Sequence, residues 1–140
     1  MILQILLWGL VIGVIHFVAV GILYMNPFTA KLYKQESEHP ALRKWPKQSE
    51  YIVKMALGTQ VEVYILTAGY IYLRSLFAEP AGWTTALILA AAFSAIRVYP
   101  RFWNMLIQSA YPRKLLAVEF VNGVAGTFVI VLGLKLLPIL

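Results

Sequence analysis

The sequence predicts an all-α integral membrane protein, a four-helix bundle with both termini on the non-cytoplasmic side. Hydrophobic residues make up 61% of the 140 residues and the mean hydropathy is +0.75, which leaves too little polar surface to coat a soluble globule. Four apolar stretches are each long enough to cross a bilayer, which takes about 20 residues. Basic residues gather in the connections on one side of these stretches. The four stretches occupy most of the chain, so residues 1–140 are expected to form a single domain.

The first predicted span covers residues 2–25. No charged side chain occurs before Lys31. The stretch lacks the basic start and the short apolar core of a cleaved signal peptide, so we expect it to be retained as a span. A cytoplasmic loop over residues 26–54 follows, and its prolines and mixed charges are typical of a solvated connection with room for one short surface helix.

The second and fourth predicted spans each carry one acid. The second covers residues 55–77, where nineteen residues separate Lys54 from Arg74 and only Glu62 among them is charged. The fourth covers residues 114–137 and holds Glu119. A charge in hydrocarbon is costly, so each acid is expected to have a partner or a function.

The third predicted span covers residues 83–110 and is kinked at Pro100. Its apolar run meets Arg97, Pro100 and Arg101 and then resumes. Proline is tolerated in a membrane helix whose neighbours satisfy the freed backbone groups, so the helix can continue through it. In the alternative interpretation the helix stops at Tyr99 and residues 101–111 lie flat in the interface.

Orientation follows from the basic residues, since short cytoplasmic loops carry the lysine and arginine excess. The loop before the second span and the turn before the fourth are basic, whereas the other side has only Arg74 and Lys135. Both termini are therefore expected outside the cytoplasm, in the plasma (inner) membrane if the source is bacterial. The net charge of +6 lies mostly beside spans, which favours membrane lipids over nucleic acid as the partner.

Helical periodicity places ionisable residues on glycine-rich faces, where another helix can approach closely. His16 shares a face with Gly9 and Gly13, and Glu62 shares one with Gly58 and Gly69. In the fourth span Glu119 lies on one stripe with Asn122, Gly123 and Gly126.

We therefore predict that Glu62 and Glu119 pair with Arg97 and Arg101 inside the bundle, because unpaired charges would strain insertion. Asn122 and Gln60 would supply nearby hydrogen bonds. The predicted polar cluster consists of His16, Glu62, Arg97, Arg101, Glu119 and Asn122.

Three interpretations of this cluster remain open. The pairs lock the helices into one register, or the cluster binds a small polar or anionic ligand or relays protons or ions. In the third, some of these side chains, Arg97 first, snorkel to the headgroups. For His16 the plain alternative is a neutral imidazole that is hydrogen-bonded across helices.

Catalytic signatures are missing from the sequence, and we expect no enzyme activity. There is no Gly-x-Ser-x-Gly, no HExxH, no phosphate loop and no aspartate. Haem ligation would usually need a second intramembrane histidine, and arginines beside His16, Glu62 and Glu119 would repel a metal cation. No catalytic residue, metal or cofactor is therefore predicted.

The order of these features resembles the DUF1761 family of small four-span membrane proteins. The resemblance rests on Gly21-Ile22-Leu23-Tyr24 at the end of the first span, Pro100 in the third, the basic turn Pro112-Arg113-Lys114 and Asn122-Gly123 in the fourth. The resemblance implies a third span that passes through the proline. The family has no assigned function, so the resemblance says nothing about activity.

Three functional hypotheses follow. The first is a small carrier or channel for a small solute, an ion or protons, acting as a homo-oligomer because four spans can scarcely enclose a pathway. The second is a non-catalytic structural or accessory subunit that docks on a partner membrane protein. The third is the binding of a lipid or another hydrophobic ligand between spans.

Overall fold

The computed structural model describes residues 1–138, and this part of the chain is all α-helical with no strand. Three helical stretches are long and apolar enough to cross a membrane: Ile2–Met25, Trp83–Gln108 and Arg113–Leu136. This indicates a multi-pass membrane protein. The remaining long helix, α3 (Gln48–Leu73), is not among the three. Its length suffices, but its polar residues, Glu62 and Gln60 among them, lower its mean hydropathy.

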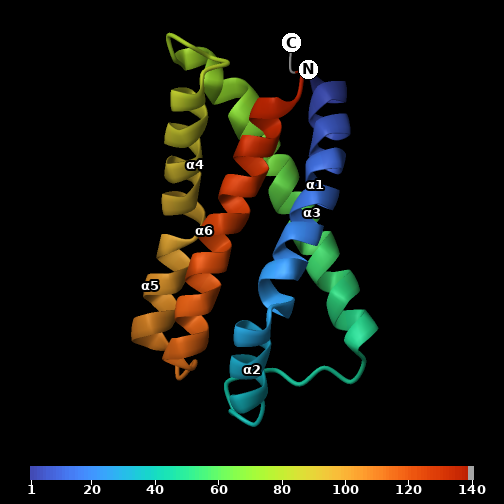
Figure 1. Cartoon of the computed structure of the whole chain (residues 1–140), viewed down its shortest axis with the longest axis vertical. Helices are drawn as coiled ribbons and strands as arrows, with labels where there is room; N and C mark the ends of the chain where they lie inside the picture. The colour runs from blue at the N-terminus through green and yellow to red at the C-terminus, as the bar shows by residue number, and fades with distance from the viewer. Residues whose placement is uncertain (139–140) are drawn as a thin grey trace.

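The helices stand side by side with both termini at one end, which we call the terminal end (Figure 1). Helix α1 (Ile2–Met25) and helix α6 (Arg113–Leu136) run next to each other, and α3 packs against both. Helix α4 (Trp83–Arg97) packs chiefly on α6. The opposite end, here called the loop end, holds helix α2 (Pro27–Gln35), residues 36–47 and the connection between helix α5 (Tyr99–Gln108) and α6.

Helix α2 (Pro27–Gln35) is separated from α1 by one extended residue, Asn26. The Asn26 side-chain oxygen accepts a hydrogen bond from the Thr29 backbone N–H at 3.0 Å, and Pro27 occupies the first helical position. Both features favour the start of a helix. The amide oxygen accepts from a backbone N–H that has no partner inside the helix, and proline has no N–H that would need one. The loop predicted over residues 26–54 thus begins with a short helix whose Leu32 is buried.

Helix α3 is packed in only one half. All of its buried residues lie between Val63 and Ile71, whereas residues 48–62 are half-buried or exposed. In Figure 1 the loop-end half of α3 diverges from α4 and α5. A short 3₁₀ turn, η1 (Arg74–Leu76), ends this segment, which begins seven residues before the predicted span.

The third predicted span consists of two consecutive helices, α4 and α5 (Tyr99–Gln108), that are broken at Val98. Pro100 has no N–H to donate to Ile96 and its ring crowds that carbonyl, so the helix is interrupted just before the proline. Helix α5 nevertheless continues alongside α6 (Figure 1). The ring centroids of Phe102 and Phe120 lie 4.8 Å apart across this contact. The segment therefore follows the continuous interpretation, with its break two residues before the predicted kink.

The apolar core lies between the middle of the bundle and the terminal end. Four helices contribute to it, and fully buried members such as Ile12, Val63 and Ile130 touch across their interfaces. The remaining core residues are Leu66, Tyr70, Ala86, Leu89, Ala90, Phe93, Val131 and Leu134. Among these core residues of the described chain only Tyr70 is ionisable, and the core lies between the polar centre and the terminal end.

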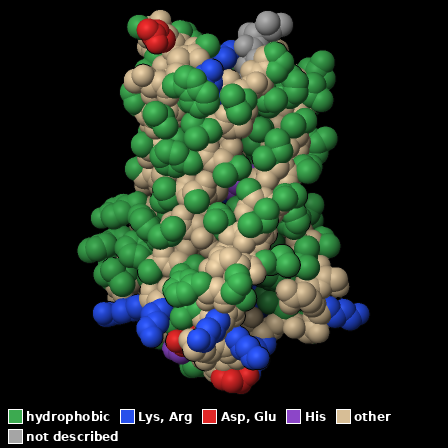
Figure 2. Space-filling view, viewed as in Figure 1, with side chains coloured by type: hydrophobic (Ala, Val, Ile, Leu, Met, Phe, Trp, Pro, Cys, Tyr) green, Lys and Arg blue, Asp and Glu red, His purple; other side chains and the backbone are tan. Residues whose placement is uncertain are grey.

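Apolar side chains also cover the outside of the bundle, and charged side chains gather at its ends (Figure 2). The exposed apolar residues include Leu6 and Val14 on α1 and Val61 and Ile65 on α3. Such a continuous apolar surface is far larger than soluble monomers expose. It is the surface that a helix bundle presents to lipid.

Candidate polar site between the helices

The centre of the candidate site is an ion pair between α3 and α4. Arg97 donates from Nε to Glu62 Oε1 at 2.5 Å and from NH2 to Glu62 Oε2 at 2.6 Å. The geometry is the bidentate fork that a guanidinium forms best with a carboxylate. The Arg97 side chain is 19% exposed and that of Glu62 is 40% exposed, so the guanidinium lies inside and the carboxylate at the edge of the bundle.

The same guanidinium also binds α6. Its NH1 donates to the Thr127 hydroxyl oxygen at 2.8 Å and to the Gly123 carbonyl at 3.3 Å, and the Thr127 hydroxyl donates to that carbonyl at 2.9 Å. Arg97 is the last residue of α4, so its side chain reaches α6 just where the helix breaks. Two of its nitrogens bind α3 and the third binds α6, so this one side chain of α4 links three helices.

A second polar cluster lies closer to the loop end, around Glu119 of α6. Tyr33 of α2 donates its hydroxyl to Glu119 Oε1 at 3.0 Å, and the Tyr111 hydroxyl donates to the same oxygen. Arg101 approaches Glu119 Oε2 at 3.5 Å, but its side chain is 73% exposed. The tyrosines are therefore the nearer partners of this carboxylate, and the arginine contributes at longer range.

Burial and the negative charge of Glu119 raise the pKa of Tyr33 above its ordinary value, and burial and the hydrogen bond to Glu119 raise that of Tyr111. A raised pKa means that the folded protein keeps these protons when the unfolded chain begins to lose them near pH 10. The contribution of both tyrosines to stability is therefore complete below about pH 10 and declines as the pH rises toward their folded-state pKa values.

We expect the free energy of unfolding to fall above about pH 10, and to fall less steeply after Tyr33→Phe with Tyr111→Phe. Unfolding in denaturing detergent between pH 8 and pH 11 measures both slopes, a range chosen around the ordinary tyrosine pKa of about 10. Tyr99→Phe removes an exposed phenol and serves as the control. Equal slopes in the double variant and the unmodified protein would contradict the buried environment of the two phenols.

His16 lies on the face of α1 that meets α6, next to Gly126 and so at the level of the Arg97 contacts on Gly123 and Thr127. Its side chain is 2% exposed, and neither ring nitrogen has a hydrogen-bond partner within the described chain. A Cβ added to Gly126 would lie 2.8 Å from His16 Nε2, so the imidazole occupies the space that this glycine leaves open. Gly126 is followed on α6 by Thr127, which binds Arg97, so the imidazole lies close to the central ion pair. Buried polar groups without partners are rare, and here two share one ring.

The two predicted amides take different places. Gln60 donates to the Gly9 carbonyl on α1 at 3.0 Å and does not contact the ion pairs, so its predicted role beside the acids is wrong. Its position about 200° around α3 from Glu62 accounts for this. Asn122 is buried on α6 beside Tyr24, and it forms no hydrogen bond with Glu62, Glu119 or either arginine within the described residues.

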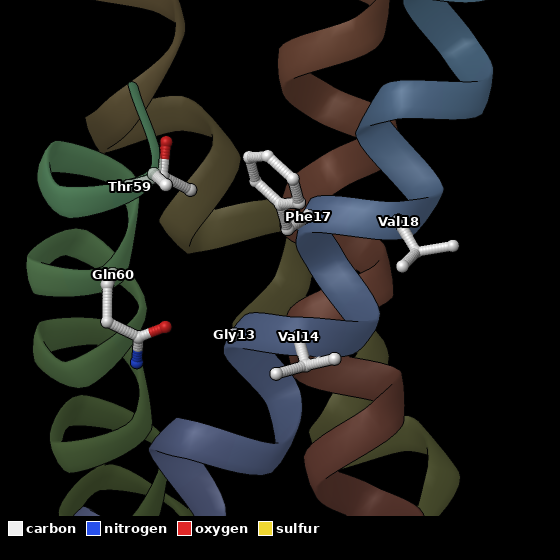
Figure 3. Close-up of a pocket in the computed structure, with 7 residues that line it drawn as sticks. Gly13, Val14, Phe17, Val18, Thr59 and Gln60 are labelled. Carbon is white, nitrogen blue, oxygen red and sulfur yellow. The ribbon is translucent and has the colours of Figure 1, made fainter. Parts of the chain in front are cut away.

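Most of the predicted packing glycines face another helix at a distance that a side chain would violate. A Cβ on Gly9 would meet the Tyr64 ring at 2.3 Å, and one on Gly13 would meet Gln60, which points toward it from α3 (Figure 3). A Cβ on Gly126 would also lie under 3.0 Å from its neighbour, whereas Cβ atoms on Gly69 and Gly123 would lie at a tight 3.1 and 3.2 Å from Phe93 and Val98. Gly58 is different. Nothing lies within 4 Å of its added Cβ, because it belongs to the divergent half of α3.

Sequence reasoning missed three hydrogen-bond partners, namely Tyr33, Tyr111 and Thr127. Thr127 is four residues after Gly123 and lies on the same stripe of α6, so helical periodicity could have found it. Tyr33 could not be found this way, because only the fold of α2 brings it to α6. No three histidine, cysteine or acidic side chains among residues 1–138 lie close enough together to hold a metal ion.

No family of known proteins, curated protein or solved structure matches this chain. The resemblance to the DUF1761 family therefore stays a prediction. What can be said of function rests on the geometry above.

Proposed function

We propose that the chain crosses the membrane four times, with α3 as the fourth crossing. Helix α3 packs between neighbours that are apolar enough to span, and its outward side chains, Leu57, Val61 and Ile65, are apolar and exposed. Its acid is neutralised by Arg97, so the cost of inserting that charge is largely removed. The polar composition that lowers the hydropathy of α3 is thus accommodated inside the bundle.

The distribution of charge supports an orientation with both termini outside the cytoplasm. The loop end carries the basic residues of α2, of the 36–47 connection and of the first turn of α6, whereas Arg74 follows α3 and Lys135 lies near the end of α6 at the terminal end. Cytoplasmic loops carry this excess in membrane proteins. The loop end would then face the cytoplasm, in the plasma membrane of a bacterium or its equivalent.

We infer that the protein acts as a small carrier or channel for a small solute, an ion or protons. The observation that carries this proposal is His16, whose two buried ring nitrogens lack protein partners beside the Glu62–Arg97 pair. Leaving such groups unsatisfied costs free energy, so a hydrogen-bonding species such as water or a transported solute is expected to complete them. Ionisable side chains buried in a membrane protein are typical of solute paths and proton relays.

The apolar core supports an inward-facing state of such a carrier. The polar residues lie between this core and the loop end, and the core closes the way to the terminal end. The described grooves are small, about 240 and 250 Å³, and both lie at the outer edges of α3. Neither groove is a path through the bundle, and we propose that the protein works as a homo-oligomer.

Flux through proteoliposomes tests this proposal. Protons, chloride and potassium are each supplied as a gradient to vesicles that contain the purified protein, and empty vesicles give the background. We expect flux of one of them above background, lost in Glu62→Gln and in Arg97→Gln but retained in the control Glu50→Gln, whose carboxylate is exposed and pairs with Lys54. Background flux for all three species, or full flux in both central variants, would overturn the carrier.

A second function is supported by the hydrogen bonding of Arg97. All three of its nitrogens are bonded within the chain, as in a structural lock that joins α3, α4 and α6. An accessory subunit that docks on a larger membrane protein would need only such a lock and an apolar exterior. Stable co-purification with one membrane partner, which persists when Glu62 and Arg97 are both replaced by glutamine and is accompanied by no flux, would favour this function.

A further inference from the structure

A groove lies between α3 and α4 beside the central ion pair. It has a volume of about 250 Å³ and is lined by Glu62, Ile65, Leu66, Phe93, Ile96 and Arg97. Ile65 and Ile96 are among the exposed apolar residues, so the groove opens laterally rather than into the bundle. The lining is apolar except for one carboxylate and one guanidinium.

The groove lies deep within the proposed membrane span. Glu62 is eight residues from Lys54, which places it about 12 Å along the helix from that basic residue. Lipids with charged headgroups do not reach this depth, because a charge in hydrocarbon is costly. An occupant that enters from the bilayer at this level must be uncharged.

Glu62 is the polar group that this groove offers. Each carboxylate oxygen accepts one hydrogen bond from Arg97, but a carboxylate has about four acceptor positions, and the side chain stays 40% exposed. Hydrocarbon cannot supply donors for the remaining positions. A hydroxyl group at the edge of the groove would supply one.

Charge complementarity selects a neutral donor over a cation. The Glu62 charge is already balanced by Arg97, whose Nε lies 2.5 Å from Oε1, so an ammonium group would meet a guanidinium as well as the acid. A hydroxyl group donates one hydrogen bond and adds no charge. The volume is below the usual range for drug-sized ligands, about 300–1,000 Å³, which favours a flexible chain over a fused ring system.

We propose that this groove binds an uncharged membrane lipid whose apolar chain lies along Ile65, Phe93 and Ile96 and whose hydroxyl group donates a hydrogen bond to Glu62. This lipid site does not depend on the proposed transport function. A protein that shows no flux would still bind the lipid, and a carrier could transport its substrate without a bound lipid.

Photolabelling in liposomes tests the site in the full-length protein. The probe is a long-chain saturated alcohol with a diazirine in its chain, and labelled residues are read by mass spectrometry. We expect labelling at Ile65, Phe93 and Ile96, suppressed by unlabelled alcohol of the same length. The alkane of that length and the matching alkyltrimethylammonium are expected to compete at least about tenfold more weakly, equivalent to about 1.4 kcal/mol.

Two substitutions test whether the probe is bound in the groove when it labels the protein. Ile96→Trp fills the groove with a larger side chain and is expected to abolish labelling, whereas Val121→Trp places the same side chain on the exposed face of α6 and is expected to leave it unchanged. The proposal is overturned if the alkane or the ammonium compound competes as well as the alcohol. It is equally overturned if both tryptophan variants label like the unmodified protein. The competition experiment needs no substitution, so misfolding of a variant leaves it decisive.

Discussion

Arg97→Leu is expected to lower the free energy of unfolding by about 2–3 kcal/mol, less than the cost of about 3–5 kcal/mol for a fully buried pair, because the Glu62 side chain is 40% exposed. The substitution removes both bonds to Glu62 and the bonds to Thr127 and Gly123, so three helices lose their common contact. The acid would remain at the edge of the bundle with no basic side chain in contact. Reversible unfolding in denaturing detergent measures this loss.

A double-mutant cycle separates the ion pair from general damage at the site. Glu62→Gln combined with Arg97→Gln is expected to cost less than the sum of the two single variants, because the double variant leaves no unpaired charge. Lys54→Gln breaks the exposed pair with Glu50 and is the matched control, expected to change stability by about 0–1 kcal/mol. Additive effects of the two central substitutions would show that the pair is not coupled in the membrane.

Gly9→Leu is expected to lower the free energy of unfolding by about 1–3 kcal/mol through overpacking. Even a Cβ at this position would lie 2.3 Å and 2.6 Å from two atoms of the Tyr64 ring. The larger side chain would separate α1 from α3 and break the hydrogen bond from Gln60 to the Gly9 carbonyl. The effect is expected to appear in the same unfolding measurement.

The chain supplies a matched control on the same helix. Gly21 has nothing within 4 Å of an added Cβ, so Gly21→Leu introduces the same side chain into α1 without a collision. We expect this variant to be as stable as the unmodified protein or slightly more stable, because glycine is a poorer helix former than leucine. If both variants lose stability equally, the close approach of α1 to α3 at Gly9 is not what the substitution disturbs.

Much of the site's membership could be predicted from the sequence. Helical periodicity placed Glu62, Arg97 and His16 on inward faces, and the cost of charge in hydrocarbon suggested that the acid and the arginine meet. The structure brings these two together at 2.5 Å. It also shows Glu62 at the edge of the bundle. Periodicity could not predict this, because it gives the direction of a side chain on its own helix and not the distance to the neighbouring helix.

The partners of Glu119 could not be predicted fully from the sequence. A charge count suggested Arg101, yet two tyrosine hydroxyls are closer partners and Arg101 remains mostly exposed. Tyr33 and Glu119 are 86 residues apart and meet because Asn26 turns the chain into α2. The loop-end half of α3 diverges from α4 and α5 and leaves Gly58 unpacked, and the residues themselves give no signal of this divergence or of the groove beside Glu62.

Composition and hydropathy by themselves determined that this is a helical protein of the membrane, and local chemistry determined the start of α2 and the break between α4 and α5. These properties depend on neighbouring residues and on the solvent, since apolar stretches enter lipid, asparagine and proline start a helix, and Pro100 interrupts one. Only the tertiary structure decided which polar groups meet and which stay without a partner, as His16 does. The reason is physical: hydrogen bonds and ion pairs form over about 3 Å, and distances that short depend on how far each helix shifts and tilts against its neighbours.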